Sequence, residues 1–166
     1  MRTLFSDNNK LRPRLMTFAR YLPDMIFLIL LSIYMFVGWK VVPFHGDEST
    51  IIRMSQDYAY LVQQHNFRMV IYNEQGENIN IDEQHQRIAL GAIAPLTIGL
   101  AWDLAGMTQN DINGFWGWFV DKPNLNTEWA WNLEQGNFPS QELLSVARIP
   151  STLLTIISLG IVFNIA

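Results

Sequence analysis

The chain has 166 residues, enough for one domain, with 11 basic residues, 15 acidic residues and a net charge of −4. It contains no cysteine, which excludes disulfides, thiolate metal sites and thiol catalysis. Most of the acidic residues follow residue 43. An acidic segment argues against nucleic acid as a partner, because binding of nucleic acid requires basic patches.

Residues 1–20 form a basic tail, and residues 21–42 are predicted to form a membrane-spanning helix. The run from Met25 to Trp39 carries no charge. Two valines and a snorkelling Lys40 extend it to the roughly 20 residues that cross a bilayer. The sequence therefore predicts a protein of the cell membrane, with the lipid bilayer as a partner.

The charges that flank this helix predict its orientation. The tail carries one acid, Asp7, and its basic residues are Arg2, Lys10, Arg12, Arg14 and Arg20. Because basic residues mark the cytoplasmic side, we expect a cytoplasmic N-terminus and an external segment over residues 43–147. A cleavable signal peptide is the alternative, and it is disfavoured because the run is long and no small-x-small cleavage site follows it.

A second uncharged run extends from Ile149 to Ala166, so residues 148–166 are predicted to form a second membrane helix in a multi-pass protein. Such a helix normally ends in charged residues at the interface, and none follows here. This pattern predicts that the second helix is truncated and that the chain is the N-terminal fragment of a longer protein.

An acidic pair follows the first predicted span. Pro43 and Gly46 break the helix, and Asp47 is well placed as the N-cap of a new helix with Glu48 in its first turn. This helix is predicted over residues 47–63, amphipathic and lying along the membrane surface. Its apolar positions are Ile51, Met54, Tyr58, Ala59 and Val62, whereas Arg53, Gln56, Asp57 and Gln63 fall on other faces.

The next segment is rich in residues that favour strands. The run from Phe67 to Tyr72, a polar turn, and residues Asn78 to Ile81 predict a small β-hairpin. Residues 88–105 are then apolar, interrupted by Pro95. We expect a second interfacial helix there rather than a membrane crossing. A full crossing would put the segment that follows it in the cytoplasm with Lys122 as its only basic residue, whereas cytoplasmic segments are normally basic. Asp57 and Asp103 are expected on polar faces.

An aromatic segment precedes the second predicted span. It comprises the sequence Gly114-Phe-Trp-Gly-Trp-Phe119 and the sequence Trp129-Ala-Trp131. Aromatic density of this kind suits a surface at the level of the lipid headgroups or a platform for binding sugars. Packing of these rings against their own helices is an equally good interpretation.

Two motifs and their order resemble a known family. Gly46-Asp47-Glu48 directly follows the first span, and Ala147-Arg148-Ile149-Pro150-Ser151 opens the second. This layout resembles the start of a GT-C membrane glycosyltransferase, most closely the protein O-mannosyltransferases and the aminoarabinose transferases. The expected fold is mainly α and integral to the membrane: two transmembrane helices flank an external segment with interfacial amphipathic helices and a small β-hairpin.

The resemblance implies transfer of a sugar from a polyprenyl-phosphate donor to an acceptor hydroxyl, with inversion. It implies that Asp47 is the catalytic base, with Glu48 beside it, because a carboxylate can take the proton of the acceptor hydroxyl. Arg148 is expected either to hold the donor phosphate or to pair with an acid of the external segment. The plain interpretation is capping of a helix by the two acids and a snorkelling arginine at the interface.

Some members of the family use a divalent metal, and Glu83 and His85 are the weak candidates here. The family often has Pro-Pro-Leu after this point, and this chain has Gln86-Arg87-Ile88 instead, so the sequence leaves a divalent metal open as a cofactor without assigning its ligands. The alternative function is a complete small two-span membrane protein, acting as an accessory subunit or binding module without catalysis. If the chain is a fragment of a transferase, it is expected to be inactive by itself.

Overall fold

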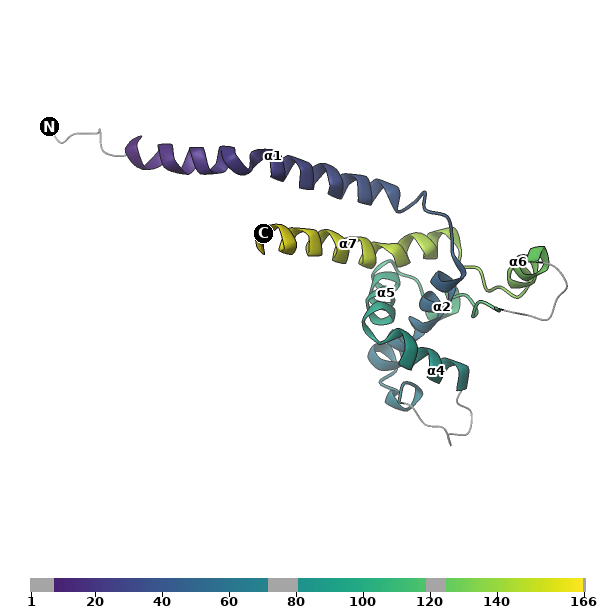
Figure 1. Cartoon of the computed structure of the whole chain (residues 1–166). Helices are drawn as coiled ribbons and strands as arrows, with labels where there is room; N and C mark the ends of the chain where they lie inside the picture. Colours follow the sequence, from purple (N-terminus) through teal and green to yellow (C-terminus); the bar gives the residue numbers. More distant parts are fainter. Residues whose placement is uncertain (1–7, 72–80, 119–124, 166) are drawn as a thin grey trace. The chain divides into compact units, whose positions relative to one another are not determined.

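The computed structural model describes residues 8–71, 81–118 and 125–165 (Figure 1). Side chains are described for residues 21–71, 83–118 and 128–165. The chain divides into two units, Met1–Gly38 with Thr155–Ala166, and Trp39–Leu154.

The first unit holds the apolar parts of two long helices. α1 extends over Asn8–Gly38, so it begins within the predicted basic tail, and α7 extends over Gln141–Ile165. The segment Tyr21–Gly38 has 18 residues, or about 27 Å at the α-helical rise. Its apolar side chains are largely exposed. Both helices are long and apolar enough to cross a membrane, which agrees with the two predicted spans.

The core of the second unit forms around one interrupted helix. α2 (Gly46–Met54) leads into the single turn α3 (Gln56–Tyr58) and then into a π-helical turn η1 over Ala59–Gln63. α5 (Ile93–Leu104) packs closely on α3, because Gly99 has no side chain and a Cβ atom there would overlap the side chain of Tyr58. The N-terminal turns of α7 complete the core. Its buried apolar residues are Ile52, Tyr58, Ala59, Ile98, Trp102, Ile112, Leu143, Leu144 and Ala147.

The predicted first strand of the β-hairpin is wrong. Phe67–Met69 forms a 3-10 helix, η2, and the N–H groups of Val70 and Ile71 both donate to the carbonyl of Phe67. The side chains of Phe67 and Ile71 are exposed, so their strand propensity gains nothing from packing on a sheet. The rest of the predicted hairpin, residues 72–80, lies outside the described residues, and Ile81 is already the first residue of α4.

α4 (Ile81–Leu90) and α5 meet at a sharp bend (Figure 1). The segments Glu83–Leu90 and Ile93–Leu104 are bent by 106°, and together they have the length and polarity of a broken span or a re-entrant loop. The bend is at Gly91, whose positive φ of 68° suits glycine. The sequence placed the interruption at Pro95, but this proline lies in the first turn of α5, where it costs no hydrogen bond.

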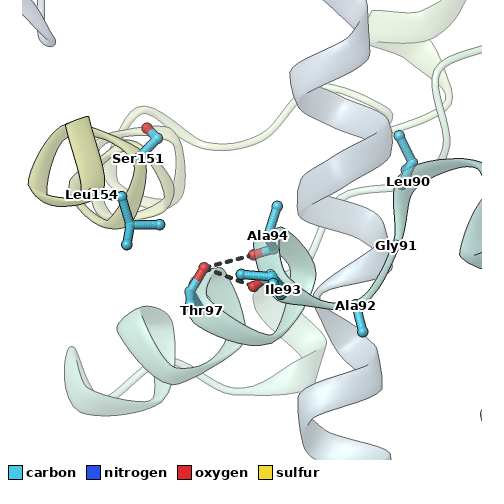
Figure 2. Close-up of a pocket in the computed structure, with 8 residues that line it drawn as sticks. All are labelled: Leu90, Gly91, Ala92, Ile93, Ala94, Thr97, Ser151 and Leu154. Carbon is cyan, nitrogen blue, oxygen red and sulfur yellow. Dashed lines mark hydrogen bonds between the residues drawn. The ribbon is translucent and has the colours of Figure 1, made fainter. Parts of the chain in front are cut away.

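A pocket of about 360 Å³ lies between this bend and α7 (Figure 2). The backbone from Leu90 to Ala94 forms one wall, and Ser151 and Leu154 of α7 face it. The hydroxyl of Thr97, which also lines the pocket, donates to the carbonyls of Ile93 and Ala94. The lining is therefore mainly apolar, with its one threonine hydroxyl turned back to its own helix.

Two short helices lie between α5 and α7 along the chain. The 3-10 helix η3 covers Gln109–Asp111 and begins with a capping box, in which Asp111 Oδ2 accepts from both the N–H and the hydroxyl of Thr108. α6 covers Leu125–Glu134. The aromatic segment between them carries no regular secondary structure over residues 112–118.

Candidate functional site

The predicted acidic pair lies in the first turn of α2, but its N-cap is His45 rather than Asp47. His45 has an extended backbone, and its Nδ1 atom lies 3.3 Å from the backbone nitrogen of Asp47. The carboxylate of Glu48 accepts in return from the N–H of His45, at 3.1 Å. This reciprocal capping box starts the helix at Gly46 and leaves the side chain of Asp47 outside the cap.

Arg148 holds Glu48 in a two-pronged ion pair. Its Nε lies 2.7 Å from Oε2 of Glu48, and its Nη2 lies 2.8 Å from Oε1. The same guanidinium donates to the carbonyls of Trp39, Val42 and Pro43. All five N–H groups of Arg148 are thereby engaged, because a guanidinium has five donors. The arginine joins α7 to the start of α2 and to the segment before it.

The two neighbouring carboxylates differ in exposure and in pairing. The side chain of Glu48 is 27% exposed and paired with Arg148, whereas that of Asp47 is 69% exposed. Nδ1 of His45 lies 3.2 Å from Oδ2 of Asp47. Nδ1 of His45 can accept the backbone N–H of Asp47 only when it carries no proton, and it can donate to the carboxylate only when it carries one, so the two contacts exclude each other. Asp47 is therefore the carboxylate that is open to an incoming group.

Five rings pack together beside this helix start, and we call them the aromatic cluster: Phe44, Trp116, Trp118, Trp129 and Phe138. Trp116 is at the centre, with ring centroids 5.5 Å from Phe44, 6.0 Å from Trp118 and 5.6 Å from Trp129. Its ring also lies against Gly46, where an added Cβ atom would be 2.8 Å from the indole. The glycine of the Gly46-Asp47-Glu48 motif thus permits the aromatic segment to pack on the start of α2.

Buried amide side chains fix the backbone of the aromatic segment. Asn113 donates to the hydroxyl of Ser49 on α2 at 2.7 Å. Asn132 accepts from the N–H of Gly117 at 2.7 Å and donates to the carbonyl of Gly117 at 3.1 Å. Asn137 donates in turn to Asn132 at 2.9 Å. Sequence reasoning missed this network, since asparagines in a loop give no spacing signal before the loop is folded.

The weak metal candidates are not brought together. Glu83 is buried and lies 3.4 Å from Arg53 and 3.6 Å from Arg87, whereas His85 is exposed. Within the described ranges, no group of three or more histidine, aspartate or glutamate side chains could hold a metal ion. The chemistry of Glu83 in this structure is that of an ion pair with two arginines.

The same two arginines belong to a buried network that the sequence did not predict. Both Nε and Nη2 of Arg87 donate to the carboxylate of Asp57, at 2.7 and 2.6 Å. Asp57, expected on a polar face, is buried. The sequence does contain one indication of this network. Arg53 and Asp57 are one helical turn apart, and so are Glu83 and Arg87, so the two helices carry complementary pairs of charges.

Comparisons with protein-family models, with curated proteins and with solved structures gave no match to this chain. The site itself combines an exposed carboxylate, a neighbouring carboxylate fixed by an arginine, and a packed aromatic surface beside them.

Proposed function

We propose that this chain carries the base of a membrane glycosyltransferase, which moves a sugar from a polyprenyl-phosphate donor to an acceptor hydroxyl on the external face. One observation carries the proposal most strongly. Of two adjacent carboxylates at the start of α2, Glu48 is fixed by Arg148, while Asp47 is 69% exposed. A general base must be able to meet its substrate, and Asp47 satisfies that condition.

In the proposed reaction, Asp47 takes the proton of the acceptor hydroxyl. The acceptor oxygen forms a bond to the anomeric carbon from one side, while the bond from that carbon to the phosphate oxygen breaks on the other. The configuration inverts, and the polyprenyl phosphate leaves with the bonding electrons. Glu48 positions the helix start through its capping box and its pair with Arg148.

The role of Arg148 within this proposal is structural. Each of its N–H groups already donates to a protein acceptor, so holding a donor phosphate would require the loss of some of these bonds. We therefore assign to Arg148 the positioning of Glu48 and of the segment that follows the first predicted span.

The proposed orientation places the N-terminus in the cytoplasm and residues 43–147 on the external side. The basic tail supports this orientation, because positive charge is retained in the cytoplasm. The bend between α4 and α5 supports an interfacial position for these helices, since Ile88 and Ile93 beside it are exposed and uncharged. Interfacial positions for residues 47–63 and 88–105 stay predictions.

The decisive substitution is Asp47→Asn, made in the complete product of the gene and assayed in native membranes with radiolabelled polyprenyl-phosphate sugars. We expect transfer to fall about a hundredfold or more, the usual contribution of a general base. Glu134→Gln, at an exposed carboxylate on α6, is the matched control and should leave transfer unchanged.

Insertion into the membrane should be the same for both variants, measured by protease protection of the two sides. Near-normal transfer by Asp47→Asn would remove Asp47 as the base. A binding module without catalysis, the second candidate, predicts no labelled product from the unsubstituted protein with any donor.

A further inference from the structure

Two rings of the aromatic cluster are exposed although a third, between them, is buried. Trp118 is 44% exposed and Trp129 is 50% exposed, whereas Trp116, which contacts both, is 7% exposed. Large aromatic side chains that are exposed and yet supported by a packed neighbour are typical of recognition surfaces. The cluster therefore presents more aromatic surface than its own packing requires.

The backbone that leads into Trp118 is anchored by hydrogen bonds. The preceding residue, Gly117, uses its N–H and its carbonyl in hydrogen bonds with Asn132. Trp116, one residue further back, donates its indole N–H to Glu128 at 3.1 Å. A surface that is rigid before binding loses little conformational entropy when a ligand arrives.

Trp118 lies next to the proposed base. Its ring centroid is 5.9 Å from that of His45, and Nδ1 of His45 is 3.2 Å from the carboxylate of Asp47. Trp118 and Asp47 thus both lie beside the ring of His45. Because the base takes its proton from the acceptor, the molecule on Trp118 is the acceptor rather than the donor.

The charges beside the cluster indicate the chemistry of that molecule. Among the described residues between Ile112 and Ala147, none is a lysine or an arginine. The carboxylate of Glu128 accepts from Trp116 of the cluster, and that of Asp47 lies beside His45, which contacts Trp118. Two carboxylates disfavour an anionic group on the acceptor itself. A neutral ring that offers hydroxyl donors and an apolar face fits both the carboxylates and the indole.

We propose that the acceptor is a carbohydrate, and that one of its rings stacks on Trp118 with a hydroxyl directed to Asp47; this inference rests on the proposed function. The hydroxyl gives its proton to Asp47, its oxygen bonds to the anomeric carbon of the donor, and the polyprenyl phosphate is released. The acceptor class is thereby a glycan or a glycolipid headgroup, not the hydroxyl of a peptide side chain.

The test measures binding apart from transfer. The complete protein in nanodiscs of neutral phosphatidylcholine is titrated with cellohexaose, maltohexaose and mannohexaose, and saturation-transfer NMR reports contact. Trp118→Ala should weaken the affinity for the bound oligosaccharide about tenfold or more, as truncation of a central tryptophan does. Trp118→Phe should restore most of it, since a phenyl ring also stacks.

Two further variants separate the two proposals. Leu133→Ala, at an exposed apolar residue on α6, should leave saccharide binding unchanged. Asp47→Asn should retain binding while it loses transfer. If none of the three oligosaccharides binds, or if Trp118→Ala binds them as well as the unsubstituted protein, the carbohydrate inference is overturned and the assignment of Asp47 stands. If the saccharides bind through Trp118 but Asp47→Asn retains transfer, the proposed function fails, and the acceptor role fails with it.

The competing occupant is the bilayer. The protein is placed in nanodiscs made with lipids brominated close to the headgroup, which quench nearby tryptophans. The fluorescence of Trp118 is obtained by subtracting the spectrum of Trp118→Phe from that of the unsubstituted protein. If the bromine does not quench the fluorescence of Trp118, the ring is open to a water-soluble saccharide; strong quenching would show the ring embedded in lipid and would overturn the inference.

Discussion

The interrupted helix formed by α2 and α3 has a charged cluster at each end, and the two clusters are built differently. At its start, Glu48 is paired with Arg148 while Asp47 is 69% exposed. Toward its other end, Asp57 and Glu83 are both buried and both paired with arginines. The first cluster leaves a carboxylate open to solvent, and the second leaves none.

This difference separates two uses of charge. In the second cluster two acids face two arginines, so a balanced set of charges joins α4 to the helix that precedes it. Such a cluster specifies how the helices dock, and removal of one member leaves an uncompensated charge in the interior. In the first cluster the ion pair orients the helix start, and the adjacent carboxylate is available for chemistry.

Arg87→Ala should produce the largest loss of stability, because Asp57 would be left buried without its partner. Loss of one member of a buried pair costs about 3–5 kcal/mol. Denaturant unfolding in detergent micelles, followed by circular dichroism, measures it. Arg68→Ala, at an exposed arginine, is the control and should change stability by less than about 0.5 kcal/mol.

A double-mutant cycle with Asp57→Ala sharpens this prediction. The double variant should lose less stability than the sum of the two single variants, because it leaves no unpaired charge. Additive losses, or a loss at Arg87 as small as that at Arg68, would remove the distinction between the two clusters.

Arg148→Ala should have the next largest effect. Glu48 would lose both of its guanidinium bonds, and three backbone carbonyls would lose a donor. Because the glutamate is 27% exposed, water compensates in part, and we expect a loss of about 2–3 kcal/mol. Arg148→Lys should recover only part of it, since an ammonium cannot form the two-pronged pair.

Transfer activity gives a second reading of the same variants. If Arg148 acts only by positioning, Arg148→Lys should keep measurable transfer and an unchanged affinity for the donor. A selective loss of donor affinity in Arg148→Lys, at normal stability, would instead assign the donor phosphate to Arg148.

The sequence predicted those features that depend on continuous local patterns. The two long apolar helices follow from uncharged runs, and the start of α2 within one residue of Asp47 follows from the break at Pro43 and Gly46. For Arg148 the sequence predicted either the donor phosphate or a pair with an acid of the external segment, and the structure pairs it with Glu48 at 2.7 Å. The sequence did not distinguish the exposed carboxylate from the paired one, because both are acids at the same helix start.

The features that were missed depend on contacts between segments far apart in the chain. Asp57 and Arg87 are 30 residues apart, and the spacing of charges within each helix does not by itself show that the two helices pack together. The strand-favouring residues from Phe67 turn into a 3-10 helix, since propensity decides little where side chains stay exposed. The bend at Gly91 was assigned to Pro95, because a proline is the more conspicuous interruption but is tolerated in a first helical turn.

The smallest expected effect concerns an exposed carboxylate that has hydrogen bonds but, among the described residues, no basic partner, which makes it intermediate between the two clusters. The backbone N–H of Thr108, and then its hydroxyl, donate to Asp111 and lower the pKa of that carboxyl below its ordinary value of 3.8. Because the pKa of Asp111 is lower in the folded state than in the unfolded state, this carboxylate stabilises the protein at pH values above the unfolded-state pKa. The contribution is lost as the pH falls through the folded-state pKa.

Thr108→Ala removes the hydroxyl and keeps the backbone N–H, so the pKa of Asp111 should move only part of the way back toward 3.8. Thr108→Ser, which retains a hydroxyl, should leave it in place. Carbon-detected NMR of the Asp111 carboxyl group, titrated from neutral to acidic pH, measures both. The loss of stability in Thr108→Ala should be smaller than in either arginine variant and confined to pH values above the folded pKa. Equal pKa values in the alanine and serine variants would show that the backbone N–H alone holds this carboxylate, and that exposed acids here respond to the backbone rather than to their side-chain neighbours.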